Sequence, residues 1–276
     1  MLGAIIGDVA GSFREFCLSK YPELPLLPDM NDIPMRKDES KQLKYGVTDD
    51  SILTIATADA CLALVDDRQG FRSFADFYYA YGMKYRSPIG GFGGGFVRWL
   101  NGGDKQPYNS CGNGSAMRIS PVAYVGKSIE DVLELAYFSA SCTHNHPEGI
   151  KGAQATAMMI YYANKGMKLP EIITELEDAW LSYEPIEQFP HFDSVCPETM
   201  RIVMHVLLTT DNFHDAVYKA VTTPNGDSDT LGAIVGAIAE ALYGIPQEYA
   251  DKVLPMIPIE MKQVYDNFKA KFISVK

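Results

Sequence analysis

The sequence predicts an all-α fold in which many helices pack as a compact bundle. Apolar residues recur at helical spacing along most of the 276 residues, and several segments begin with helix-capping residues. No stretch alternates apolar and polar residues between hairpin turns, as strands do. Because 47% of the residues are hydrophobic and no linker or internal repeat divides the chain, we expect a single domain over residues 1–276.

The first predicted element is a helix at the N-terminus. Its small residues recur one turn apart on one face, at Gly3, Gly7 and Gly11. A face of this kind lets another helix approach closely. Asp8 and Glu15 lie two turns apart and share a helix face. Taken alone, these two residues fit a solvated acidic stripe, or a salt bridge with Arg14.

Two interior helices are predicted over residues 51–65 and 231–245. In the second, the apolar residues follow the i, i+3, i+4, i+7 and i+11 pattern, at Leu231, Ile234, Val235, Ile238 and Leu242. Small residues fill its other faces, so neighbouring helices can pack tightly. This segment contains Glu240 and is too short to cross a bilayer.

Other helices are indicated by their first residues. Ser128 is a capping residue for a helix to about Ser141, and Pro170 suits the first turn of a helix that ends near Trp180. Helical patterns also cover residues 73–85, 148–164, 196–209, 211–222 and 259–272. Three loops separate them, at residues 17–47, 87–95 and 102–114, and the first is long enough to be a mobile flap.

Charge and cysteine content exclude several classes of function. The formal net charge is -11 and the isoelectric point about 4.9, so nucleic acid would be repelled. The N-terminus lacks the basic start of a signal peptide. Five scattered cysteines without C-x-x-C spacing indicate reduced thiols. We therefore expect a cytoplasmic protein that binds neither nucleic acid nor membranes.

The most informative feature is a pair of acidic clusters, each at the start of an interior helix. They are Thr48-Asp49-Asp50 and Asp227-Ser228-Asp229-Thr230. A single acidic residue there would be an ordinary helix cap. Two matched clusters instead suggest the halves of one all-oxygen site, which favours magnesium, manganese or calcium. Four or five carboxylates could hold two ions about 3.5–4 Å apart.

Three other motifs leave alternatives open. Asp227-Ser228-Asp229 does not begin an EF-hand, because that loop requires glutamate where the chain has Ile238. The segment from Thr143 to Glu148 contains H-x-H-x-E, which fits a helix cap or a ligand contact better than a transition-metal site. The glycine turns at residues 90–95 and 112–114 are either amide donors for phosphate or tight turns without a ligand.

Together these segments resemble the ADP-ribosylglycohydrolase family. The resemblance rests on five motifs that occur in family order. They are Gly3-Ala4-Ile5-Ile6-Gly7-Asp8 through Gly11 and Glu15, Thr48-Asp49-Asp50-Ser51, Gly112-Asn113-Gly114-Ser115-Ala116-Met117-Arg118, Thr143-His144, and Asp227-Ser228-Asp229-Thr230. The resemblance implies an orthogonal helical bundle with two Mg²⁺ (or Mn²⁺) ions in a cleft.

The resemblance also implies roles for individual residues. The metal ligands would be Thr48, Asp49, Asp50, Asp227, Asp229 and Thr230. ADP-ribose would contact Gly91, Gly93, Phe96, Ser110, Gly112, Asn113 and His144. One carboxylate among Glu15, Asp50 and Asp229 would handle the proton while C1″ of the distal ribose passes through an oxocarbenium-like state.

The expected activity is metal-dependent removal of ADP-ribose from an ADP-ribosylated protein or small molecule. The bond would be an arginine N-glycoside or a serine O-glycoside. Two alternatives stay open, a two-metal hydrolase of another nucleotide-type metabolite and a non-catalytic ADP-ribose-binding protein. The sequence predicts no oligomeric state.

Overall fold

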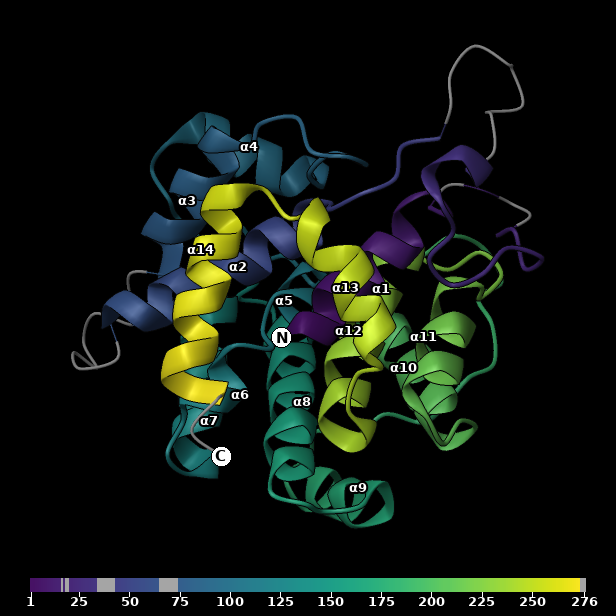
Figure 1. The fold of residues 1–276 in the computed structure, drawn as a ribbon. Helices are drawn as coiled ribbons and strands as arrows, with labels where there is room; N and C mark the ends of the chain where they lie inside the picture. The colour runs from purple at the N-terminus through teal and green to yellow at the C-terminus, as the bar shows by residue number, and fades with distance from the viewer. Residues whose placement is uncertain (16, 18–19, 34–42, 65–73, 274–276) are drawn as a thin grey trace.

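The computed structural model describes the chain except for residues 16, 18–19, 34–42, 65–73 and 274–276 (Figure 1). The described residues form helices and contain no strand. Two isolated bridges, Thr48 with Ile89 and Gly112 with Val195, are the β-type pairings recorded among them. The predicted all-α fold is confirmed.

Helices follow one another along the chain, with longer connections before α2, before α5 and before α10. The α-helices are α1 (Leu2–Ser12), α2 (Asp49–Leu64), α3 (Phe74–Lys84), α4 (Gly94–Gly102), α5 (Gly114–Met117), α6 (Val122–Val125), α7 (Ile129–Ser141), α8 (Pro147–Asn164), α9 (Leu169–Asp178), α10 (Cys196–Leu208), α11 (Phe213–Val221), α12 (Ser228–Tyr243), α13 (Gln247–Val253) and α14 (Ile259–Phe268). Shorter turns are the 3₁₀ segments η1 (Met30–Asp32) and η3 (Leu254–Met256) and the π turn η4 (Lys269–Ile273).

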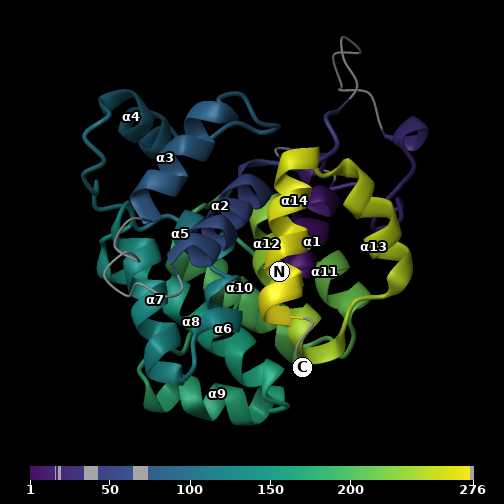
Figure 2. The ribbon, with the colours of Figure 1, turned by 60° about the vertical axis from the view of Figure 1, so that its left-hand side comes forward.

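Helices α1 and α12 lie side by side in the middle of the molecule (Figure 1, Figure 2). Their small residues face each other, as the glycine spacing predicts. A Cβ built on Gly3 would lie 2.1 Å from the carbonyl oxygen of Gly236, and one on Gly11 would lie 2.3 Å from that of Ser228. Both glycines therefore permit a backbone contact that no larger residue would allow.

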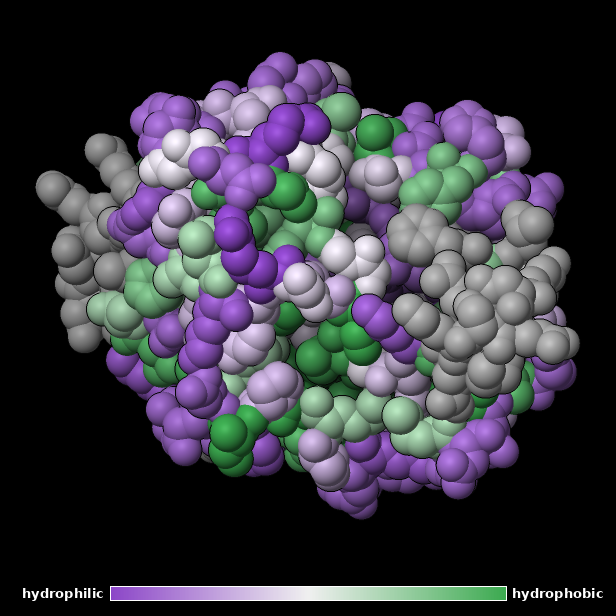
Figure 3. Space-filling model, turned by 90° about the horizontal axis from the view of Figure 1, so that it is seen from above, coloured by the Kyte–Doolittle hydropathy of each residue, from purple (hydrophilic) through white to green (hydrophobic). Residues whose placement is uncertain are grey.

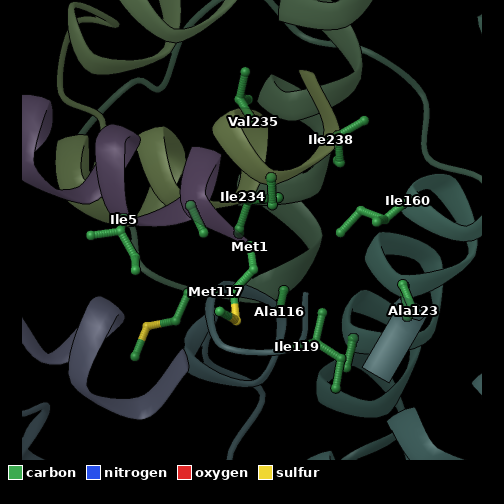
Figure 4. Close-up of a cluster of buried hydrophobic side chains, with 14 of the residues drawn as sticks. Met1, Ile5, Ala116, Met117, Ile119, Ala123, Ile160, Ile234, Val235 and Ile238 are labelled. Carbon is green, nitrogen blue, oxygen red and sulfur yellow. The ribbon is translucent and has the colours of Figure 1, made fainter. Parts of the chain in front are cut away.

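The core surrounds this helix pair. Side chains from α1, α5, α8 and α12 converge on it, including Ile5, Met117, Ile160 and Ile234 (Figure 4). Every residue of α1 is buried, and so are the first twelve residues of α12. The prediction that α12 is an interior helix is therefore confirmed. The last long helix, α14, packs against α2 from outside (Figure 2).

The predicted helix starts agree with the structure. The Ser128 side chain accepts a hydrogen bond from the amide of Asp131 at 3.3 Å and caps α7. Pro170 lies in the first turn of α9, which ends two residues before Trp180. The helix expected over residues 259–272 ends at Phe268 and continues as the π turn.

Three helices, α4, α6 and α13, were not predicted, whereas α5 begins where the glycine turn at residues 112–114 was expected to enter a helix. α4 begins with two glycines inside the expected loops, and glycine is a poor helix former. α5 and α6 are single turns, and α13 has seven residues, too few for a clear hydrophobic period. These short elements depend on tertiary packing more than on local sequence.

The interpretation of Asp8, Glu15 and Arg14 as a solvated stripe or salt bridge is wrong. Asp8 is fully buried, and helix α1 ends before Glu15. Arg14 is also fully buried and donates to backbone carbonyls instead. Its acceptors are the carbonyl oxygens of Ala10, Lys20, Leu24, Pro25 and Leu26.

The expected flap at residues 17–47 is described only in part. Residues 18–19 and 34–42 lie outside the described residues. The segment around Leu24–Leu26 is held against α1 by Arg14, and Leu26 and Leu27 join the core.

On the face of the molecule seen from above, hydrophilic and hydrophobic side chains are interspersed (Figure 3). Among the described helices, none has the length and apolar character that a bilayer crossing requires.

Candidate active site

The N-terminal ends of α2, α5 and α12 meet at a cavity of about 350 Å³. The cavity is lined by every predicted site residue except Thr48. These lining residues are Glu15, Asp49, Asp50, Gly91, Gly93, Phe96, Ser110, Gly112, Asn113, His144, Asp227, Asp229 and Thr230. Residues from positions 15 to 230 therefore share one cavity because the helices bring distant segments together.

The first acidic cluster is held in place by Asp8 of α1. Thr48 donates to the Asp8 carboxylate through its amide at 3.0 Å and through its hydroxyl at 2.7 Å. Ser51 also donates to Asp8, through its amide at 3.1 Å and through its hydroxyl. Asp8 thus fixes the turn that starts α2. Thr48 is fully buried behind the cavity and does not line it.

The second cluster contacts the first directly. The hydroxyl of Thr230 donates to Asp50 Oδ2 at 3.4 Å, and Thr48 Oγ1 lies 3.3 Å from the same oxygen. On the other side, the Asn113 amide group donates to Asp227 Oδ2 at 2.9 Å. The structure therefore brings together the two clusters that are about 180 residues apart in the sequence.

Two groups of three carboxylates lie close enough to share an ion. In each group, one oxygen per residue lies within 4.8 Å of the others. The first group is Asp8, Asp50 and Asp229, and the second is Glu15, Asp227 and Asp229. Asp229 belongs to both groups and stands between them.

This packing of carboxylates favours their protonated forms. Burial and neighbouring carboxylates raise the pKa values of Asp49, Asp50, Asp227 and Asp229 well above their usual range. Burial, followed by Asp227, raises the pKa of Glu15 to about 8. Burial raises the pKa of Asp8 to about 6, although hydrogen bonds from Ser51 and Thr48 oppose the rise.

The donor set fits hard divalent cations. It consists of carboxylate and hydroxyl oxygens, the ligands that magnesium and manganese prefer. Asp50 Oδ1 is buried and has no hydrogen-bond partner within the described protein. An unpartnered buried carboxylate oxygen is costly unless a cation binds it. The residues present therefore match a metal-binding site in chemistry and in burial.

Above the carboxylates lies the glycine-rich segment at residues 90–96. Gly90 and Gly91 have φ values of +78° and +91°, a region that favours glycine. A Cβ on Gly90 would lie 2.6 Å from Glu15 Oε2, so glycine lets the backbone pass over this carboxylate. The bridge between Thr48 and Ile89 fixes the segment beside the first acidic cluster.

Another part of the cavity wall is the turn at residues 110–114. The amide of Gly112 donates to Ser110 Oγ at 3.1 Å, and the amide of Asn113 donates to the carbonyl of Ser194 at 2.9 Å. These two amides are therefore engaged within the protein. The side chains of Ser110 and Asn113 still face the cavity.

His144 and His146 have different environments. His146 caps α8, where its Nδ1 accepts from the amide of Glu148 at 3.1 Å. His144 lines the cavity and contacts the ring of Tyr108, with the ring centroids 6.0 Å apart. Burial, followed by the charge of Arg118, lowers the pKa of His144 well below its usual value. The cap expected for this motif is confirmed at His146, and the ligand contact stays a prediction for His144.

Several cavity residues were not among the predicted site residues. Asp8 supports the first cluster, while Tyr108, Met117, Arg118 and Phe192 line the walls. Asp8 and Arg118 both belong to glycine-containing motifs, in which Asp8 directly follows Gly7 and Arg118 lies one helical turn after Gly114. Nothing in the local sequence marks Phe192, which approaches the cavity through tertiary folding.

Comparisons with known proteins point to one family. The sequence model of the ADP-ribosylglycohydrolase family matches residues 1–272. The chain is 27% identical to the ADP-ribosyl-[dinitrogen reductase] glycohydrolase of Rhodospirillum rubrum over 244 residues, covering 82% of this chain and 80% of that protein. It is 26% identical to the ADP-ribosylarginine hydrolase Tri1 of Pseudomonas putida, covering 92% of this chain and 72% of the relative.

Two further likenesses point the same way. The chain is 26% identical to the mouse ADP-ribosylhydrolase ARH3 over 192 residues and spans 50% of that protein. A solved ADP-ribosylglycohydrolase-related protein complex superposes with a TM-score of 0.70 at 20% identity, over 98% of this chain and 95% of the other. The family match covers nearly the whole chain and includes every acidic residue of the cavity, so the chain belongs to the ADP-ribosylglycohydrolase family.

Proposed function

We propose that this protein removes ADP-ribose from an acceptor by hydrolysing the bond at C1″ of the distal ribose. The acceptor atom would be an arginine nitrogen or a serine oxygen. The observation that carries the proposal is the buried group of carboxylates at the end of a cavity of about 350 Å³. Cavities of roughly 300–1,000 Å³ suit small-molecule ligands and cofactors.

Two divalent cations, Mg²⁺ or Mn²⁺, are proposed to bind between the acidic clusters. The residues that would hold them are Asp49, Asp50, Asp227, Asp229 and Thr230, which line the cavity, and Thr48, whose hydroxyl would have to turn from Asp8 toward the ions. When bound, such ions lower the pKa of water and polarise ribose hydroxyl groups. The support is the unpartnered Asp50 Oδ1 and the position of Asp229 in both carboxylate groups.

Glu15 is the proposed acid and base, with Asp50 and Asp229 as the other candidates. Its Oε2 lies below Gly90 and beside Asp229. In the ion-free site, burial followed by Asp227 raises the pKa of Glu15 to about 8, which supports a role for this carboxyl in proton transfer at neutral pH. Groups with pKa values near the working pH are suited to general acid–base catalysis.

The walls of the cavity would orient the substrate. The walls include the glycine segment with Gly91, Gly93 and Phe96, and a second group formed by Ser110, Gly112, Asn113 and His144. Together the walls offer hydroxyl, amide and imidazole groups around an apolar ring. This combination suits a ligand with hydroxyl, phosphate and aromatic parts, as ADP-ribose has.

Release of ADP-ribose from peptides would test the proposal. Peptides carrying mono-ADP-ribosylated arginine or serine would be incubated with the protein and Mg²⁺, then with EDTA. We expect release from at least one peptide with Mg²⁺, and its loss with EDTA and in Asp229→Asn. Absence of release from both peptides in a folded, Mg²⁺-saturated protein would count against the proposed function.

A further inference from the structure

We propose that Arg118 and Thr143 are positioning residues that hold the His144 imidazole in the tautomer protonated at Nε2. In this tautomer Nε2–H is directed at an acceptor oxygen of the ligand in the cavity. The identity of the ligand rests on the proposed function, whereas the tautomer does not depend on it.

The first step is the direction of the hydrogen bond between Arg118 and Thr143. The Arg118 guanidinium is fully buried and lies 3.9 Å from the centre of the Tyr78 ring. It donates to the carbonyl of Ser139 at 3.1 Å and to Thr143 Oγ1 at 2.7 Å. Guanidinium groups have no acceptor, so the Thr143 oxygen accepts this bond. The hydroxyl hydrogen of Thr143 is left to donate.

The second step is the partner of that hydrogen. Thr143 Oγ1 lies 2.8 Å from His144 Nδ1. The nearby thiol of Cys142 donates to the carbonyl of Ser139 at 3.2 Å, and its sulfur is a weak acceptor. An imidazole nitrogen is the stronger acceptor. An Nδ1–H donating to Thr143 Oγ1 would leave the Thr143 hydrogen to the weakly accepting Cys142 sulfur. We therefore infer that the hydroxyl donates to Nδ1, which then carries no proton.

The third step is the charge of the ring. His144 is 6% exposed, and burial together with the Arg118 charge lowers its pKa well below the usual value. The imidazole is therefore neutral at neutral pH and carries one proton. Because Nδ1 accepts, that proton lies on Nε2.

The fourth step is the direction of Nε2. A Cβ built on Gly114 would lie 3.1 Å from His144 Nε2, and one on Gly112 would lie 3.6 Å from it. The Cβ built on Gly112 would also lie 3.2 Å from Ser110 Oγ. Ser110 Oγ accepts the Gly112 amide hydrogen, which leaves its own hydrogen free to donate. Two donors thus converge above the bare Cα of Gly112, an arrangement that suits an acceptor oxygen.

The tautomer can be read directly in the ligand-free protein. Long-range ¹H–¹⁵N NMR of imidazole nitrogens distinguishes the two tautomers, and His144→Asn assigns the signal among the five histidines. We expect Nε2–H in the wild type and in Thr143→Ser, which keeps the hydroxyl. In Thr143→Val the population should shift toward Nδ1–H. An Nδ1–H tautomer in the wild type, or an unchanged tautomer in Thr143→Val, would overturn the proposal.

Ligand binding supplies a second readout. In Thr143→Val we expect the Kd for ADP-ribose, measured by calorimetry, to rise by roughly tenfold, with near wild-type affinity in Thr143→Ser. Thr156→Val is the matched control, because Thr156 is equally buried but donates to Gly152 within α8. Equal affinities in the wild type, Thr143→Val, Thr143→Ser and Thr156→Val would show that the hydrogen bond from Thr143 to His144 has no role in binding and would overturn that part of the proposal. Failure of the wild type to bind ADP-ribose would instead contradict the proposed function, and the NMR result would still decide the tautomer.

Discussion

Gly7 of α1 and Gly232 of α12 face each other in direct backbone contact. A Cβ built on Gly7 would lie 1.8 Å from the carbonyl oxygen of Gly232, and one on Gly232 would lie 2.3 Å from that of Gly7. Asp8 follows Gly7, and Asp229 precedes Gly232 by almost one helical turn. The close approach of these two helices therefore sets the distance between carboxylates that stand on different elements.

Gly7→Ala is expected to be strongly destabilising. The added methyl group meets backbone atoms that cannot move independently, so we expect a loss of about 3 kcal/mol in the free energy of unfolding. Urea denaturation would measure it. Gly102→Ala is the matched control, since that helical glycine has only one atom within 4 Å of the built Cβ, at 3.9 Å. Equal stability of the two variants would contradict the close packing.

Asp8→Asn tests whether Asp8 fixes the first acidic cluster. The carboxylate accepts hydrogen bonds from Thr48 and Ser51, and an amide group would place donors against donors. We expect a loss of about 2 kcal/mol in stability and weaker Mg²⁺ binding by calorimetry. The control Asp76→Asn changes a side chain that is 58% exposed and should alter stability by less than about 0.5 kcal/mol. If both variants behaved alike, Asp8 would have no supporting role.

Much of the arrangement could be predicted from local patterns. The glycine stripe of α1, the small residues of α12 and the two acidic helix starts each have a signature that short-range rules recognise. The function of Asp8 could not be read in this way. Its partners, Thr48 and Ser51, are about 40 residues away, and on a helix with glycines on another face it looked like a solvated residue.

The same limit applies to the walls of the cavity. Phe192 lines the cavity from a connection before α10, where no helical or capping pattern constrains it. α4 begins in a glycine-rich stretch whose intrinsic preference is for turns, and contacts with the rest of the molecule override that preference. Only tertiary packing determines these positions.

Mg²⁺ is expected to stabilise the wild type and not Asp229→Asn. A ligand that binds only the folded state at 100 times its Kd adds about 2.7 kcal/mol. Because Asp229 belongs to both carboxylate groups, its loss should remove most of this gain. Thermal unfolding with Mg²⁺ and with EDTA would measure the difference, with Asp76→Asn as control. A full Mg²⁺ shift in Asp229→Asn would place the ions elsewhere.

Stability should fall at acidic pH in part through His144. Burial keeps the pKa of His144 well below its usual value in the folded state, while the unfolded chain has the ordinary value near 6.5. As the pH falls through 6.5, the unfolded state takes up a proton that the folded state does not. The contribution of His144 to the free energy of unfolding is thus fully present above pH 6.5. Below that pH it is lost by up to about 1.4 kcal/mol per pH unit.

Comparison of the wild type with His144→Asn isolates this contribution. The stability of the wild type should decline more steeply between pH 7 and pH 5 than that of the variant, both in saturating Mg²⁺. Denaturant unfolding at several pH values would measure both slopes. Parallel curves would show that His144 takes up its proton in the folded state, contrary to its burial.

Lys20→Met is expected to destabilise the metal-free protein more than the Mg²⁺-bound one. Lys20 is 4% exposed, and its ammonium donates to the carbonyl of Gly226 at 2.7 Å and to Ser228 Oγ at 2.9 Å, on either side of Asp227. Methionine would relieve the desolvation of a buried cation, but it would leave these acceptors unpaired and remove a charge that faces the carboxylates. Breaking such a buried network costs about 3 kcal/mol.

Bound Mg²⁺ supplies positive charge to the same carboxylates and, without Lys20, is repelled less by the protein. The loss of stability caused by Lys20→Met should therefore shrink as Mg²⁺ saturates the site. Urea unfolding with EDTA and with Mg²⁺ would measure both losses. Lys84→Met is the control, since the Lys84 side chain is 52% exposed and pairs with Glu260 at the surface. A loss for Lys20→Met that is the same with EDTA and with Mg²⁺ would show that Lys20 acts on the fold without affecting the ions.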